Sequence, residues 1–240
     1  MMANKWNKYK ILIPNSFTAL SLILGLIALQ LIFEGEFEKA AWLIAVSMVC
    51  DFLDGKIARM LDAMSKFGAT FDTLADFVAF GVVPGFLAYK SSLYQIKIVG
   101  FIVVVFYVFA GGYRLVRFTH SNINPTKKHP FIGLPIPAAA GTISSFIIVN
   151  FYLWNQVKSP DILLAVVFIS AILMISKIEY LPLDKGHKFT KETKLFISLG
   201  ILSAIAAFWY PYIIFIGWII IYILYGIIRH IILAAKKQQK

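Results

Sequence analysis

The stretch DFLDGKIARMLDAMSKFGATFDTLAD, which runs from Asp51 to Asp76, decides the fold of this chain. Four of its aspartates stand between segments that are apolar enough to be membrane helices: Asp51, Asp54, Asp72 and Asp76. A carboxylate buried in such surroundings costs several kcal/mol unless it is paired or binds a cation. Four carboxylates together need a large positive charge, and divalent metal is its simplest source.

The spacing of the motif predicts that its side chains converge. At roughly 100° per residue, five residues of the first half fall within about 140° of one helix face: Asp51, Asp54, Gly55, Ala58 and Arg59. Asp72 and Asp76 are one turn apart on the next helix, and Gly68 shares their face. Two antiparallel helices joined by a short turn can aim both carboxylate pairs at one point. Oxygen ligands favour Mg²⁺, Mn²⁺ or Ca²⁺ over Zn²⁺.

The composition is that of a polytopic membrane protein rather than a soluble domain. The chain has 240 residues, of which 60% are hydrophobic, and its mean hydropathy is +0.79. Residues 1–240 are expected to form a single membrane-embedded domain, an all-α helical bundle with about eight transmembrane helices. The expected spans are 11–33, 39–61, 68–89, 97–117, 131–154, 160–177, 194–208 and 213–234. The basic, aromatic segment 1–10 is expected to form a short interfacial helix before them.

The basic residues orient the chain in the membrane. The net charge of +11 does not indicate a nucleic-acid partner, because Lys and Arg gather at the ends of the spans. Nineteen of the 23 lie on the side of the N-terminus, and only Lys39, Lys90, Lys97 and Lys158 lie on the other. This bias predicts a multi-pass protein of the cell membrane with both termini and the aspartate motif in the cytoplasm.

Four aspartates at a cytoplasmic membrane face suit phosphoryl-transfer chemistry. Two divalent ions held about 3.5–4 Å apart can clamp a pyrophosphate and stabilise both the entering and the leaving oxygen. Arg59 is placed to offset part of the phosphate charge, because its planar guanidinium donates paired hydrogen bonds. The membrane setting implies that one substrate is a lipid. The position of the motif at the cytoplasmic face implies that the other substrate is soluble.

The motif D-x2-D-G-x2-A-R-x8-G-x3-D-x3-D resembles the signature of the CDP-alcohol phosphotransferases, with every fixed position present. The resemblance implies transfer of a phosphatidyl group from a CDP-linked lipid to an alcohol with release of CMP, two divalent cations (Mg²⁺ or Mn²⁺), and a homodimer. It implies that Asp51 and Asp72 ligate both metals, that Asp54 completes the first site, and that Asp76 completes the second and is the catalytic base.

The same resemblance implies a CDP-lipid site on the first three spans. Its expected residues are Pro14, Asn15, Ser16, Phe17, Gly55, Ala58, Arg59, Ser65 and Gly68. In the first span, Asn15, Ser16 and Thr18 have two interpretations: they cap the start of the helix, or they face the nucleotide.

The acceptor alcohol is indicated by a second resemblance. The runs RLVRF from Arg114 and FIGLPIPAAA from Phe131, with MISKIEY from Met174, look like the phosphatidylserine synthase branch, although Val116 and Thr119 replace the usual Ala and Asn. Free L-serine carries a carboxylate that needs a cation. Arg114 and Arg117 lie three residues apart at a cytoplasmic span end, so at least one is expected to bind it. The alternative is that both only anchor the helix at the lipid headgroups.

Two rival functions remain open at this point. The first is the same chemistry with another acceptor, such as glycerol 3-phosphate or inositol phosphate. The second is a membrane cation transporter, in which the acidic site carries ions or forms a buried ion-pair network. The residues do not distinguish ester-linked from ether-linked lipid tails.

Overall fold

The computed structural model describes residues 2–61, 63, 65–121, 131–180 and 209–238, which are almost entirely helical. The helices are α1 (Met2–Phe33), α2 (Phe37–Met60), α3 (Lys66–Asp76), η1 (Phe77–Val82), α4 (Val83–Ser91), η2 (Leu93–Ile96), α5 (Lys97–Ser121), α6 (Ile136–Trp154), α7 (Pro160–Ile175) and α9 (Pro211–Gln238). Within this part of the chain, five helical segments are long and apolar enough to cross a membrane. The all-α membrane fold predicted from the sequence is confirmed.

Helices occupy each predicted span except 194–208, which lies outside the described residues. One boundary differs from the prediction, because α6 begins at Ile136 rather than at residue 131. Phe131–Ile132 instead form β1, which pairs antiparallel with β2 (Glu179–Tyr180), and Gly133 then turns the chain with a φ of +85°. The segment 1–10 is helical from residue 2, but it is continuous with the first span in α1 rather than a separate helix.

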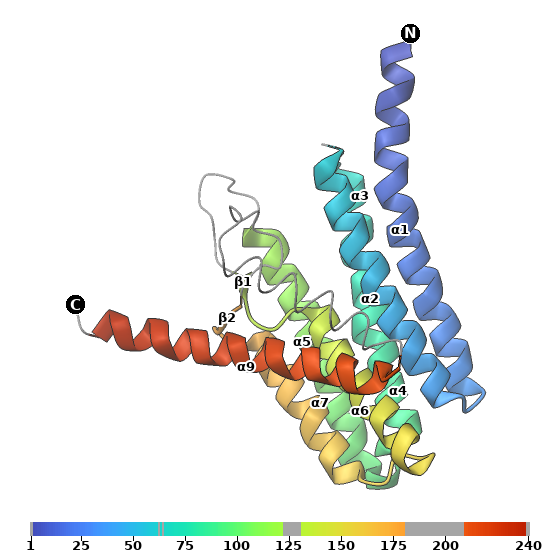
Figure 1. Ribbon diagram of the computed structural model, residues 1–240, viewed down its shortest axis with the longest axis vertical. Coiled ribbons are helices and arrows are strands. Elements are labelled where there is room, and N and C mark those ends of the chain that lie inside the picture. Colours follow the sequence, from blue (N-terminus) through green and yellow to red (C-terminus); the bar gives the residue numbers. More distant parts are fainter. Residues whose placement is uncertain (1, 62, 64, 122–130, 181–208, 239–240) are drawn as a thin grey trace.

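Figure 1 shows how the helices are arranged. The first helix, α1, runs beside the two motif helices, α2 and α3, along one edge of the molecule. The turn between α2 and α3 faces the same end as the N-terminus, so both halves of the motif meet there. The last helix, α9, runs across the bundle and packs on α6 and β2.

The second half of the motif lies on a helix whose start is capped and whose middle is widened. Ser65 is the N-cap of α3, and its hydroxyl accepts a 3.0 Å hydrogen bond from the Gly68 N–H. The helix then continues without a break into η1, a π-helical segment that begins directly after Asp76. Such segments are rare and often lie at functional sites.

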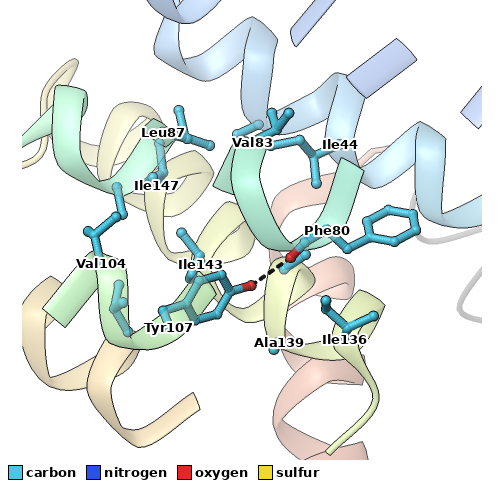
Figure 2. Packing of buried hydrophobic residues seen from close by; sticks show 14 of the residues in the cluster. Ile44, Phe80, Val83, Leu87, Val104, Tyr107, Ile136, Ala139, Ile143 and Ile147 are labelled. Carbon is cyan, nitrogen blue, oxygen red and sulfur yellow. Dashed lines mark hydrogen bonds between the residues drawn. The ribbon is translucent and has the colours of Figure 1, made fainter. Parts of the chain in front are cut away.

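The central core holds the π-helical segment in place (Figure 2). Phe80 and Tyr107 are fully buried, and the Tyr107 phenol of α5 donates a 2.9 Å hydrogen bond to the Phe80 carbonyl. Ile44 of α2, Val83 of α4 and Ile143 of α6 belong to the same buried cluster. The core therefore fixes the helix that carries the second pair of aspartates.

We expect Tyr107→Phe to destabilise the protein measurably. The variant keeps the ring but removes the donor to a buried carbonyl, at a cost of about 1–3 kcal/mol. For a chain of this length, the midpoint of thermal unfolding in detergent should fall by roughly 2–4 °C per kcal/mol. Tyr113→Phe, on the same helix but 55% exposed, is the matched control. Equal shifts in the two variants would show that the Tyr107 hydrogen bond contributes nothing.

Candidate metal centre

Three carboxylates of the motif converge on one point. Asp51 comes from α2, and Asp72 and Asp76 lie one turn apart on α3. One oxygen of each lies within 4.8 Å of the other two, and the carboxyl groups of Asp51 and Asp76 are within hydrogen-bonding reach. The helical spacing predicted this convergence, and the structure bears it out for these three residues.

Asp54 lies beside this cluster rather than in it. Its side chain is 5% exposed, and its Oδ2 accepts a 2.7 Å hydrogen bond from the hydroxyl of Thr18 in α1. It still lies in the electrostatic field of Asp51 and Asp72. The acidic site is thus built from three converging carboxylates and a fourth that α1 holds next to them.

The donor set fits a hard divalent cation. All the ligands on offer are carboxylate oxygens, which Mg²⁺, Mn²⁺ and Ca²⁺ prefer. Arg114 of α5 is 6% exposed, and its charge acts on Asp51 and Asp76. Arg114 alone does not balance four acids, and a bound cation would relieve the repulsion that is left.

The residues predicted for the CDP-lipid form two groups. The first group, which includes Asn15, Ser65 and Gly68, lies where α1 meets the start of α3. A Cβ added to Gly68 would lie 2.8 Å from Asn15 Oδ1 and 2.9 Å from Ser65 Oγ. A side chain at this position would therefore push Asn15 away or disturb the Ser65 cap. The absence of a Cβ at Gly68 lets the two helices approach with both polar groups in place.

The other predicted residues of α1 differ in their surroundings. Pro14 is buried and Phe17 is half-buried, whereas Ser16 is exposed and donates a 2.7 Å hydrogen bond to a carbonyl of its own helix. Ser16 therefore makes a local bond within α1, while Asn15 lies against the second motif helix.

The second group lies on α2, in the turn that directly follows Asp54. Gly55 and Ala58 are half-buried, and Arg59 is exposed. A Cβ added to Gly55 would lie 3.7 Å from a terminal nitrogen of Arg59. The guanidinium thus folds back over the glycine of the motif, where it can meet an anionic ligand beside the carboxylates.

Arg117, which was predicted together with Arg114 as a serine-binding residue, has a different position. Its two terminal nitrogens donate four hydrogen bonds of 2.6–3.3 Å to the backbone carbonyls of Ile132, Met174, Ile175 and Ser176. The last carbonyls of a helix have no partner within it, and Arg117 supplies donors to those of α7. Gly133 passes so close that a Cβ there would overlap the Arg117 guanidinium. Arg117 thus ties α5 to β1 and to the end of α7.

Two features of the site carry no clear signal in the sequence. The bond between Thr18 and Asp54 joins residues 36 positions apart; the sequence marked Thr18 as a polar residue of the first span, but neither of its two interpretations, a helix cap or a contact with the nucleotide, named Asp54 as its partner. Tyr222 of α9 lies in the electrostatic field of Arg114. No motif marks Tyr222, because its helix is apolar along most of its length.

The fold and the site together define a polytopic membrane protein with an acidic cluster that could hold a metal ion. The model of the CDP-alcohol phosphatidyltransferase family matches residues 11–180, and the chain belongs to this family.

Several relatives extend this likeness. The chain is 36% identical over 230 residues to a protein of Helicobacter pylori named CDP-diacylglycerol–serine O-phosphatidyltransferase, covering 94% of this chain and 93% of that one. A Methanocaldococcus jannaschii protein of the same name is 33% identical over 223 residues, with 92% and 95% covered. The archaetidylserine synthase of Methanothermobacter thermautotrophicus is 33% identical over 186 residues, with 77% and 76% covered.

We expect Mn²⁺ to raise the thermal unfolding midpoint of the protein purified in detergent and stripped with EDTA, because a ligand of the folded state stabilises it. Asp51→Asn should abolish this rise. In EDTA its midpoint should equal or exceed that of the wild type, because one of three mutually repelling charges is gone. Asp161→Asn, an exposed position in the first turn of α7, should keep the full rise. A normal Mn²⁺ response in Asp51→Asn would exclude that residue from the site.

Proposed function

We propose that the protein transfers the phosphatidyl group of a CDP-linked lipid to the hydroxyl of L-serine and releases CMP. The observation that carries the proposal is the convergence of Asp51, Asp72 and Asp76 in a membrane-embedded chain of the CDP-alcohol phosphatidyltransferase family. The names of the relatives support serine as the acceptor.

The proposed cofactors are two divalent cations, Mg²⁺ or Mn²⁺. Asp51 and Asp72 would ligate both ions, Asp54 would complete the first site, and Asp76 would complete the second. When bound, two such ions neutralise the pyrophosphate and stabilise the entering and leaving oxygens of a phosphoryl displacement. The three converging oxygens, with Asp54 in the field of two of them, support this assignment.

In the proposed step, the serine hydroxyl oxygen forms a bond to the lipid-linked phosphorus. The bond from that phosphorus to the bridging oxygen of CMP breaks, and CMP leaves with its electron pair. Asp76 takes the proton of the hydroxyl as general base, which requires that one of its oxygens stays free. The packed π-helical segment that follows Asp76 keeps this carboxylate in position.

The CDP-lipid would be bound by α1, α2 and the start of α3. Arg59 would donate hydrogen bonds to the phosphates, and the small residues would let the ligand approach the backbone. The proposed binding residues are Pro14, Asn15, Ser16, Phe17, Gly55, Ala58, Arg59, Ser65 and Gly68.

The carboxylate of serine would be bound by Arg114. This arginine is buried, and its charge acts on Asp76, the proposed base. Arg117 was predicted on the same grounds, but its terminal N–H groups are engaged by four backbone carbonyls. This supports Arg114 as the anchor of serine and Arg117 as a brace between helices.

The site and both termini would face the cytoplasm, as the bias of Lys and Arg indicates. The relatives are named for both diacylglycerol and archaetidyl lipids, so an ester-linked and an ether-linked CDP-lipid are both candidate substrates. The homodimer that the family resemblance implies stays a prediction.

The decisive experiment measures CMP release by the purified protein in mixed micelles of detergent and CDP-diacylglycerol. We expect CMP in the presence of Mg²⁺ or Mn²⁺ and L-serine, and none without serine or with Asp76→Asn. Glycerol 3-phosphate and inositol phosphate are tested in parallel, and the ether-linked CDP-lipid is tested beside the ester-linked one. Release with another alcohol only would overturn serine as the acceptor, and no release under any condition would overturn the proposed reaction.

We expect Arg114→Gln to raise the KM for serine about tenfold or more, because a charge-assisted hydrogen bond to the carboxylate is lost. The KM for the CDP-lipid should change much less. Arg117→Gln should instead lower the thermal unfolding midpoint and leave the serine KM within about twofold of the wild type. The opposite pattern would exchange the roles of the two arginines.

A further inference from the structure

Among the described residues, Asp54 is the motif aspartate whose carboxylate accepts a hydrogen bond from a side-chain hydroxyl, that of Thr18. Asp51, Asp72 and Asp76 face one another across α2 and α3. Asp54 lies one turn after Asp51 on α2, but its Oδ2 is bound by Thr18 from a third helix, α1. Its contribution to a metal centre therefore depends on how α1 orients it.

The hydrogen bond from Thr18 to Asp54 is short and shielded from water. Thr18 is 4% exposed and Asp54 is 5% exposed. The Thr18 hydroxyl lies 2.7 Å from Asp54 Oδ2 and 3.3 Å from the Pro14 carbonyl. It has one hydrogen to donate, and the shorter distance favours the carboxylate over the carbonyl.

This arrangement overrides the usual local bond of a helical threonine. A threonine inside a helix commonly bonds to the carbonyl four residues earlier, which here is that of Pro14. The proton goes instead to a carboxylate on another helix, 36 residues away in sequence. With Oδ2 held in this way, the Asp54 carboxylate is fixed beside Asp51 and Asp72, whose charges act on it.

We infer that Thr18 is a positioning residue of the metal centre, which fixes the carboxylate of Asp54 so that its second oxygen can ligate a cation. The inference rests on the metal dependence in the proposed function. Hydrogen-bond partners of metal ligands commonly set the orientation of those ligands, and their loss weakens metal binding by about 10–100-fold. Asn15, one turn earlier on α1, lies against Gly68 of α3, so α1 braces both halves of the motif.

The test measures Mn²⁺ binding to the full-length protein in detergent without any CDP-lipid, from the electron paramagnetic resonance signal of free Mn²⁺. Thr18→Val removes the hydroxyl at nearly constant volume, and Thr18→Ala removes it with less bulk, so the result does not depend on one variant folding. Thr18→Ser keeps the hydroxyl. Ser21→Ala is the matched control, because Ser21 is also buried on α1 but bonds to Ser47 instead of an aspartate.

We expect Thr18→Val and Thr18→Ala to weaken Mn²⁺ binding by about tenfold or more, with Thr18→Ser and Ser21→Ala within about threefold of the wild type. In the CMP assay, the Mn²⁺ concentration for half-maximal rate should rise by a similar factor. Unchanged Mn²⁺ affinity without the hydroxyl, or an equal loss in Thr18→Ser or Ser21→Ala, would overturn the role of Thr18. A wild type that binds no Mn²⁺ but releases CMP would overturn the metal site itself and with it this inference.

Discussion

Repulsion among carboxylates in a low-dielectric setting is the constraint on which the rest of this structure depends. Two carboxylates that were both ionised, with oxygens about 4.8 Å apart, would repel each other by about 3 kcal/mol at an effective dielectric constant of 20. Ionising all three together without a cation would therefore cost a sizeable part of the free energy that stabilises a typical folded domain. Holding these groups together without a cation lowers the free energy of unfolding. The same repulsion favours the binding of a divalent ion.

The helices around the cluster are fixed by hydrogen bonds that lie out of reach of water. The hydroxyls of Ser21 and Ser47 are bonded to each other at 2.8 Å between α1 and α2, and Tyr107 holds η1 at the Phe80 carbonyl. In an apolar environment, an unmade bond of this kind costs more than it would in water. These bonds therefore fix α2 against α1, and they fix the helix of the second aspartate pair against α5.

Periodicity was enough to predict the helices and the convergence of three aspartates. Asp51, Asp72 and Asp76 meet because a helix repeats every 3.6 residues and a short turn joins the two helices. Periodicity could not show that Thr18 takes one oxygen of Asp54, because the pairing depends on how α1 packs on α2. It also placed the start of α6 too early, because the pairing of β1 with β2 requires a partner strand more than 40 residues away in sequence.

The two arginines of α5 show why charge counts orient a membrane protein but do not assign its sites. The positive-inside rule does not distinguish Arg114 from Arg117, because both lie near the same end of α5. They differ in what lies opposite: the aspartates and Tyr222 for Arg114, and the carbonyls at the end of α7 for Arg117. Tyr222 lies on α9, beyond the residues that the family model matches. The surroundings of Arg114 therefore include a helix that lies outside the part of the chain matched by the family model.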